Sequence, residues 1–525
     1  MLPMTGVDGS FLNLETPQTP MHVGSLHLFE VPDGDVAGFH PMLVRHIAAR
    51  LDRVPVFRRR LAPMPLQFAN PVWVDDDGVD LDHHIRRVVL PAPGTREQLF
   101  RAAADLHSTL MDRSRPLWMI YVFEGLASGE VAYYIKVHHA VLDGQAGIAL
   151  AQTLFDDAPH APVRRRPRAS GTPRVERPGT AALAAAAFRH DAAQLVRLVR
   201  QLPEVARTLG GLLRAAGAEL PSGAPKSGRL APRTVFNASV GTEREFAAVS
   251  IPLAQVKRIA AAHEAKVNDV VLAICSAALR GYLKAHGGIP RRSLVASMPV
   301  SLRAPGQAAD YTTQVTMALV SLASDVADPV RRLRAIRDAA GSMKSTIGRA
   351  RNIIPTDFPT IGLPWITHGL ATLAGRSHLA DALPPLSNVV ISNVPGPRGS
   401  LYGGLARMTS YWPLSIVEHG AALNITLISY AGELGFGLIA ARNAVPDLAP
   451  IAQGLLDAFE ELERRTPSAE PVEPRRSAAS RRSSKNEPKP SARAPDKVQY
   501  GVAPAPKAAA ARGRASARRP VPATR

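Results

Sequence analysis

The chain has 525 residues, a formal net charge of +19, and 46% hydrophobic residues. A single core stops growing at roughly 250 to 300 residues, so we expect two domains rather than one. The single cysteine, Cys275, excludes an internal disulfide framework and a thiolate metal cluster within one chain, and the absence of about 18 consecutive apolar residues excludes a membrane-spanning helix.

The first part of the chain alternates between strand-like and helix-like segments. Residues 22 to 30 alternate like a strand, whereas residues 36 to 52 and 97 to 111 have apolar residues at helical spacing. Residues 131 to 137, VAYYIKV, are rich in aromatic and β-branched side chains, which predicts a strand. Residues 144 to 155 then predict a helix, so a strand-to-helix turn lies between them.

That turn has the sequence VHHAVLDG. Consecutive side chains on a strand point to opposite faces, so only one of His138 and His139 can face a given cleft. Zinc enzymes need three protein ligands, and only Asp143 stands nearby, which disfavours a metal site. A neutral imidazole could instead take a proton as a general base. Asp143 could cap the next helix or pair with an arginine. Gly144 permits a tight backbone conformation at the turn. The residues alone leave a general base and a structural turn open.

A linker and a helical segment follow. Residues 158 to 180 are rich in Pro and Arg, which predicts an exposed linker. Residues 181 to 220 are rich in Ala, Leu and Arg, and a break at Pro203 predicts two amphipathic helices. These helices either pack across the two domains or lie with their basic faces on a membrane surface.

The second half again mixes strands and helices. Its helix at 267 to 286 begins with Asn268 and Asp269, which either cap the backbone or take part in an active site. The alternation in both halves predicts a two-domain α/β or α+β architecture. The predicted strands lie at 246 to 253, 293 to 302, 313 to 322 and 386 to 394, with a hairpin at 421 to 439 that turns at Ala431-Gly432.

The last residues, 466 to 525, hold 14 Lys and Arg against 4 Asp and Glu, a net +10 of the total +19. Such a segment has too few apolar residues to fold, so we expect a disordered basic tail. It is either simply solvated or attracted to anionic lipid headgroups or nucleic acid. The rest of the chain keeps about half of the excess charge, and only the tail favours a nucleic-acid-binding function, which therefore ranks last.

The motif HHAVLDG matches the HHxxxDG pattern of acyltransferases related to chloramphenicol acetyltransferase and peptide-synthetase condensation domains. Further segments narrow the match. From about residue 1 to 462 the chain resembles the bacterial wax ester synthase/acyl-CoA:diacylglycerol acyltransferase family in VDGSFLNLETPQTPMHVGSLHLFE, VPVFRRRL, DLDHHIRRVVLP, RPLW, APRTVFN, VNDVVLA, MPVSLR and SNVVISNVPGPRGSLYGG.

This resemblance implies two chloramphenicol-acetyltransferase-like domains with a substrate tunnel between them. The expected organisation is an N-terminal acyltransferase domain (1–157), a linker with amphipathic helices (158–228), a C-terminal acyltransferase domain (229–465) and the basic tail (466–525). The implied activity is acyl transfer from long-chain acyl-CoA, a co-substrate, to diacylglycerol or a fatty alcohol, with no other cofactor and no metal. The protein would act in the cytoplasm, at the inner face of the membrane or on lipid droplets.

The resemblance also assigns residues. His139 would be the general base, His138 would support the strand from its other side, and Asp143 with Gly144 would shape the turn, with Arg303 as a candidate partner of Asp143.

Other motifs give weaker expectations. Pro116, Leu117 and Trp118 either pack in the core or form a wall of the lipid tunnel, and Ser392 and Asn393 would help position substrate. The family's Gly-Asn pair is replaced near Asp310-Tyr311, so the substrate preference or the rate is expected to differ. Two rival functions stay open: a catalytically weak protein that binds lipid or coats lipid droplets, and an acyltransferase for another alcohol or amine.

Overall fold

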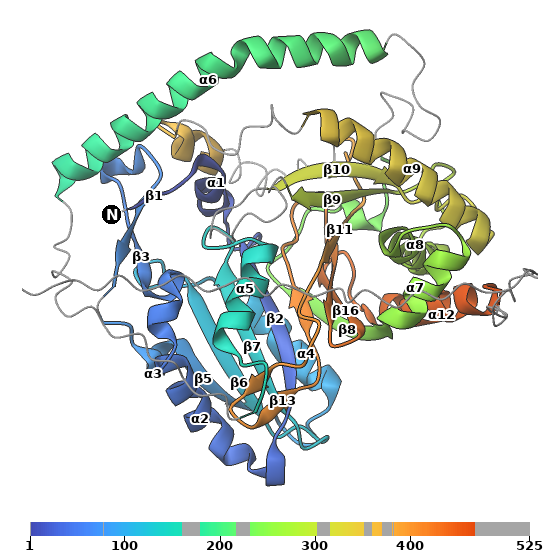
Figure 1. Cartoon of the computed structure of the whole chain (residues 1–525), viewed down its shortest axis with the longest axis horizontal. Coiled ribbons are helices and arrows are strands. Elements are labelled where there is room, and N and C mark those ends of the chain that lie inside the picture. Colours follow the sequence, from blue (N-terminus) through green and yellow to red (C-terminus); the bar gives the residue numbers. More distant parts are fainter. Residues whose placement is uncertain are drawn as a thin grey trace, which may run out of the picture. The chain divides into compact units, whose positions relative to one another are not determined.

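The first sheet has β7 (Val131–His138) at its centre, between β2 (His22–Glu30) and β6 (Trp118–Glu124), with antiparallel pairing on both sides. β5 (Ile85–Val89) lies parallel to β6 at one edge (Figure 1). The strands predicted at 22 to 30 and 131 to 137 are confirmed. The computed structural model describes residues 2–76, 78–159, 179–216, 231–301, 315–350, 360–369, 381 and 383–467.

Side chains of β7 alternate between two cores, as the period of a strand requires. Ala132 and Tyr134 pack in a cluster with α4 (Arg96–Ser108). Tyr133 and Ile135 pack on the other face, in the cluster that holds α2 (Val36–Ala48) and α5 (Gly144–Leu154). The two adjacent histidines at the end of the strand are therefore directed to different sides of the sheet.

The second sheet has the order β10-β9-β11-β15-β16-β8, and its largest hydrophobic core lies beneath four helices. The hairpin predicted to turn at Ala431-Gly432 is confirmed, because both residues have positive φ angles, 46° and 92°. The strands are β8 (Arg244–Pro252), β9 (Val295–Ser301), β10 (Val315–Ser321), β11 (Val389–Val394), β15 (Leu423–Tyr430) and β16 (Glu433–Ala441), and the helices are α7 (Leu253–Ala262), α8 (Val267–Ala285), α9 (Pro329–Ala350) and α12 (Ala449–Arg464).

Three short strands of the second half join the first sheet. β13 (Ala406–Met408) and β14 (Trp412–Leu414) both pair with β2, and β12 (Tyr402–Gly403) pairs with β13. The crossing chain lies so close to β16 that a Cβ on Gly437 would stand 1.7 Å from the Pro413 carbonyl oxygen. The expected domain boundary near residue 229 therefore does not separate the two sheets, because strands from beyond it belong to the first sheet.

A small third sheet and a long helix complete the described fold. β1 (Leu2–Pro3), β4 (Val72–Asp75) and β3 (Arg59–Ala62) form the sheet, and α1 (Gly6–Leu14) follows β1, while α3 (Leu81–His84) leads into β5. Figure 1 shows α6 (Thr180–Ala216) as one continuous, bent helix. The predicted break into two helices at Pro203 is wrong, because proline removes one backbone hydrogen bond and a helix can absorb that loss by bending. The predicted linker at 158 to 180 and the basic tail lie almost wholly outside the described residues.

Candidate active site

A cavity of about 450 Å³ lies between the two sheets, which is within the usual range for small-molecule sites. Its walls come from β2, β7, α1 and α5 on one side and from β9, β10, β11 and β15 on the other, with β14 contributing as well. Most of the lining surface is apolar, and polar side chains make up a minority of the lining residues. The cavity therefore suits a ligand that is mainly hydrocarbon and has a small polar centre.

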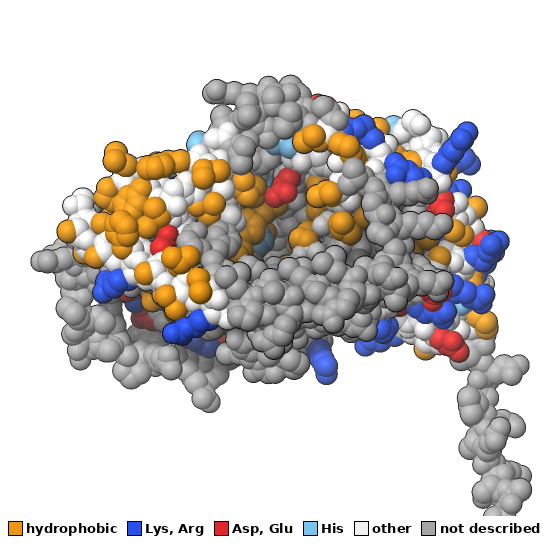
Figure 2. Space-filling model, turned by 90° about the horizontal axis from the view of Figure 1, so that it is seen from above, with side chains coloured by type: hydrophobic (Ala, Val, Ile, Leu, Met, Phe, Trp, Pro, Cys, Tyr) orange, Lys and Arg blue, Asp and Glu red, His pale blue; other side chains and the backbone are white. Residues whose placement is uncertain are grey.

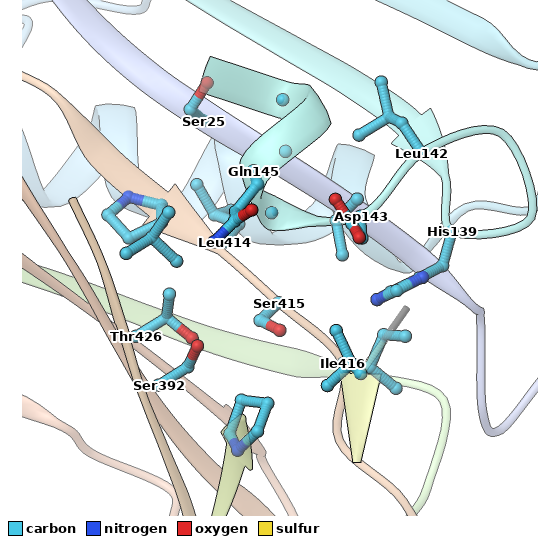
Figure 3. A pocket seen from close by; sticks show the side chains of 18 of the residues that line it. Ser25, His139, Leu142, Asp143, Gln145, Ser392, Leu414, Ser415, Ile416 and Thr426 are labelled. Atoms are coloured by element: carbon cyan, nitrogen blue, oxygen red, sulfur yellow. The ribbon is translucent and has the colours of Figure 1, made fainter. Parts of the chain in front are cut away.

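His139 lies in the wall of this cavity, one residue beyond the end of β7. Its ring stacks on Phe11 with a centroid distance of 4.0 Å, and its backbone N–H donates to the Met21 carbonyl oxygen at 2.8 Å. Figure 3 shows the ring extending into the space beside Ser415 and Ile416. Burial lowers the pKa of His139 below its ordinary value, and the Asp143 carboxylate partly opposes this shift. The imidazole is therefore neutral near pH 7 and can accept a proton.

His138 points away from the cavity. Its Nδ1 accepts the Ala140 N–H at 3.0 Å, so in the neutral ring the proton lies on Nε2, which is 3.3 Å from Glu15 Oε1. His138 is fully buried, and this burial lowers the pKa of its ring while Glu15 opposes the shift. The structure thus separates the two histidines: His139 faces the cavity, and His138 faces a buried carboxylate.

Glu15 was not predicted as a site residue. Burial alone would raise its pKa, but hydrogen bonding to His138 and His22 lowers the pKa well below the usual range. The same carboxylate accepts the Met21 N–H at 3.1 Å and pairs with Arg113 at 2.8 Å. Since Met21 in turn accepts the His139 N–H, Glu15 braces the strand end that carries the imidazole. The only sequence signal for it was an acidic residue at the end of α1, which is too common to be informative alone.

Asp143 is the N-cap of α5, since its Oδ1 accepts the Ala146 N–H at 3.0 Å. Gly144 follows at the start of the helix, and a Cβ there would stand 3.2 Å from Cγ2 of Val394 at the end of β11. Both residues line the cavity. Of the two roles considered for Asp143, the structure shows helix capping, and Arg303 lies outside the described residues.

The second half contributes a polar strip to the opposite wall. Ser392 and Asn393 of β11 line the cavity, and Asn393 Nδ2 lies 3.4 Å from Asn268 Oδ1. Asp269 instead accepts the Lys266 N–H at 2.8 Å, which fixes the start of α8. Two further polar residues of β15 line the cavity, and the Thr426 hydroxyl donates to Asn424 Oδ1 at 2.8 Å. They were not predicted as site residues because their sequence pattern is that of an ordinary strand.

Pro116, Leu117 and Trp118 do not line the cavity. Trp118 is buried, stacks between Phe57 and His84 at 4.1 and 4.2 Å, and donates from Nε1 to the Phe57 carbonyl oxygen. Residues 116–118 were expected either to pack in the core or to form a wall of the lipid tunnel, and the structure places them in the core. The Asp310-Tyr311 departure lies outside the described residues, and within the described ranges no three His, Cys, Asp or Glu side chains gather as a metal site requires.

The fold class follows from two sheets with a cavity between them, the first of which includes short strands from the second half of the chain. The first condensation domain of the CDA synthetase has the same fold, with a TM-score of 0.52 over 89% of this chain and 96% of its own, at 16% identity. The expected two-domain fold of the chloramphenicol-acetyltransferase type is therefore confirmed.

The family follows from closer relatives. Residues 4–271 match the wax ester synthase/diacylglycerol acyltransferase catalytic domain, and residues 312–463 match the WS/DGAT C-terminal domain. A probable diacylglycerol O-acyltransferase of Mycobacterium tuberculosis is 37% identical over 87% of this chain and 98% of its own length, and the O-acyltransferase WSD of Acinetobacter baylyi is 35% identical over 88% and 96%. The wax ester synthase/diacylglycerol acyltransferase of Marinobacter aquaeolei has a TM-score of 0.61 at 32% identity, over 89% of this chain and all of its own. The chain belongs to this family and is an acyltransferase.

Proposed function

We propose that the protein transfers a long-chain acyl group from acyl-CoA to the hydroxyl group of diacylglycerol, forming triacylglycerol, and that fatty alcohols are second acceptors that give wax esters. The observation that carries this proposal is a neutral, positioned imidazole, His139, in the wall of a largely aliphatic cavity. The names of the relatives in Mycobacterium and Acinetobacter support the same reaction class.

In the proposed reaction His139 is the general base. The imidazole takes the proton of the acceptor hydroxyl as its oxygen attacks the thioester carbonyl carbon. The resulting tetrahedral intermediate collapses, the C–S bond breaks, and the imidazolium returns its proton to the departing CoA thiolate. An ester and CoA are the products, and no acyl-enzyme is formed.

The surrounding residues prepare this step without taking part in it. Phe11 stacks on the imidazole and the Met21 carbonyl fixes its backbone, so the ring is held before substrate binds. A base that is already oriented contributes to rate because less motion has to be arrested on the way to the transition state. Ser392 and Asn393, across the cavity, are candidates to position the ester-forming group.

The test is ester formation by purified protein from labelled long-chain acyl-CoA with diacylglycerol or hexadecanol. We expect His139→Ala to lower kcat by about 10² to 10⁴-fold, the usual contribution of a general base. His83→Ala is the matched control, because His83 belongs to another adjacent histidine pair and lies outside the cavity. Ester formation that survives the loss of His139 would overturn the proposed base.

The rival functions give different results in the same assay. A wild-type protein that binds acyl-CoA or diacylglycerol without turnover would be a lipid-binding or droplet-coating protein. Turnover with another alcohol or an amine, but not with diacylglycerol or hexadecanol, would keep His139 as the base and change the acceptor. We also propose a cytoplasmic protein that works at the inner face of the membrane or on lipid droplets, where such acceptors are found.

A further inference from the structure

The helix α6 has two apolar faces. One face is buried: Leu183 and Ala187 pack against the small sheet in a cluster that includes Met64 and Val72. At about 100° per residue, Phe188, Leu195 and Val199 lie together on a neighbouring face of the helix, roughly a third of a turn from the buried face. These three side chains are 61%, 58% and 57% exposed. A helix on a globular protein ordinarily needs one apolar face, so the second face is unexplained by the fold.

A strained turn adds to this face. Leu66 and Gln67 both have a φ of 52°, a backbone conformation that residues other than glycine rarely adopt. The Leu66 side chain is 87% exposed. The indole N–H of Trp365 donates to the Leu66 carbonyl oxygen at 3.0 Å. Trp365 and Ile366 are themselves 57% and 62% exposed. A backbone in a costly conformation thus presents a leucine to solvent beside a tryptophan and an isoleucine.

The turn, the 360–369 segment and α6 are fixed to one another by buried polar contacts. The Asp191 carboxylate of α6 accepts the backbone N–H groups of Thr360 and Ile361 at 2.9 and 2.7 Å. Gly362 donates to the Phe68 carbonyl oxygen at 2.7 Å, and the Phe68 and Phe188 rings lie 6.3 Å apart. We call the resulting exposed surface the α6 patch; it consists of Leu66, Phe188, Leu195, Val196, Val199, Ile361, Trp365 and Ile366.

We propose that the α6 patch docks the protein on an anionic phospholipid surface. Large exposed apolar patches mark interaction sites, and tryptophan beside aliphatic residues is typical of surfaces that enter a membrane interface. No helix in the described ranges is long and apolar enough to cross a membrane, so the contact would be superficial. The inference rests on the proposed function, because it supplies the reason for meeting lipid: the acceptors are water-insoluble.

Charge decides between a lipid surface and a second copy of the chain. Among the charged side chains described on α6, Arg189 and Arg200 are exposed, whereas Asp191 is buried and turned inward. Basic residues that flank an apolar helix face suit anionic headgroups. A second copy would bring the same arginines and a net charge of +19 against them. Figure 2 shows hydrophobic side chains gathered over the N-terminal half of α6, on a face that is hollowed beside them.

The test is flotation of the full chain with phosphatidylcholine vesicles, with and without phosphatidylglycerol. We expect binding that needs phosphatidylglycerol and weakens at high salt. The triple variant Leu195→Asp, Val199→Asp, Ile366→Asp should bind about tenfold or more weakly, because three apolar side chains no longer enter the lipid. Val89→Asp and Leu386→Asp, at residues 63% and 67% exposed outside the patch, are the matched controls and should float like the wild type.

The kinetic control separates this inference from the proposed function. Activity of the triple variant towards a short-chain acyl-CoA and a water-soluble alcohol should equal that of the wild type, whereas its activity on vesicle-borne diacylglycerol should fall with its binding. Flotation of the triple variant at the wild-type level would overturn the α6 patch as the docking site even if catalysis proceeds. A wild-type dimer that the triple substitution dissociates, with no vesicle binding, would assign the patch to a second copy instead.

Discussion

Replacing Glu15 tests how the strand end that carries His139 is held. Its buried carboxylate accepts the Met21 N–H at 3.1 Å and the Arg113 guanidinium at 2.8 Å, and it lies 3.3 Å from His138 Nε2. The Met21 carbonyl oxygen then accepts the His139 N–H at 2.8 Å. Glu15→Ala removes the acceptor at the centre of this chain of contacts.

The expected loss of stability follows from what remains buried. Breaking one side of a buried ion pair costs about 3 to 5 kcal/mol when the other charge stays uncompensated. The Arg113 side chain is 45% exposed and can turn to water, so we expect the lower end, about 3 kcal/mol, which comes mainly from the buried N–H of Met21 and from His138. A displacement of the base by about 1 Å can cost about 10²-fold in rate, so kcat should fall by that order while KM stays unchanged.

Glu15→Gln is the matched variant because its amide oxygen can still accept the Met21 N–H. We expect its kcat to stay within about threefold of the wild type, since the Met21 contact is kept, and the Arg113 side chain, whose contact is lost, is half-exposed and can turn to water. Thermal unfolding gives the stability change, and steady-state kinetics well below both melting temperatures gives kcat and KM. Wild-type kcat in Glu15→Ala would refute the brace, and an equal loss in both variants would show that the charge of Glu15 matters instead.

Three other changes have defined outcomes. Burial lowers the pKa of His22 to about 4 and that of His27 to about 3, so as the pH falls below 6.5 the unfolded chain binds protons at these residues and the folded chain does not. The free energy of unfolding should therefore drop by about 1 kcal/mol per histidine between pH 6.5 and pH 5.5. Equal denaturant midpoints at the two pH values would contradict this. Asp143→Ala should lower the stability measured by thermal unfolding by about 1 kcal/mol because it removes the cap of α5, whereas Asp143→Asn should keep most of the wild-type stability because asparagine also caps helices. Equal losses in the two variants would rule out capping as the main role of Asp143. Gly437→Ala should cost about 1 to 3 kcal/mol or more because its Cβ meets the Pro413 carbonyl, and an unchanged melting temperature would show that the crossing chain can move aside.

The sequence was informative where a local pattern determines a structure. The period of a strand separated His138 from His139, and the structure directs them to a buried carboxylate and to the cavity. The pattern of residues 421 to 439 predicted a hairpin that turns at Ala431-Gly432, and both residues have the positive φ angles that a type I′ turn requires. The HHxxxDG motif indicated the reaction class, and the family assignment confirms that class.

Long-range contacts could not be predicted in the same way. β13 and β14 are three residues each, too short to show a period, and their partner β2 lies almost four hundred residues earlier. Glu15 meets His138 only because β2 and β7 pair with His22 opposite His138. The predicted helix break at Pro203 was wrong because it was judged from the proline alone, whereas α6 continues on both sides of this residue.

The strands donated by residues 402 to 414 have a consequence for biosynthesis. Until that segment has left the ribosome, β2 pairs only with β7 and presents an unpaired edge, which is a template for association with other chains. The cavity also lacks the part of its wall that β14 and β15 supply. An N-terminal fragment with the complete HHxxxDG motif would therefore be both aggregation-prone and inactive, and the enzyme becomes competent only when nearly all of its globular part has been synthesised.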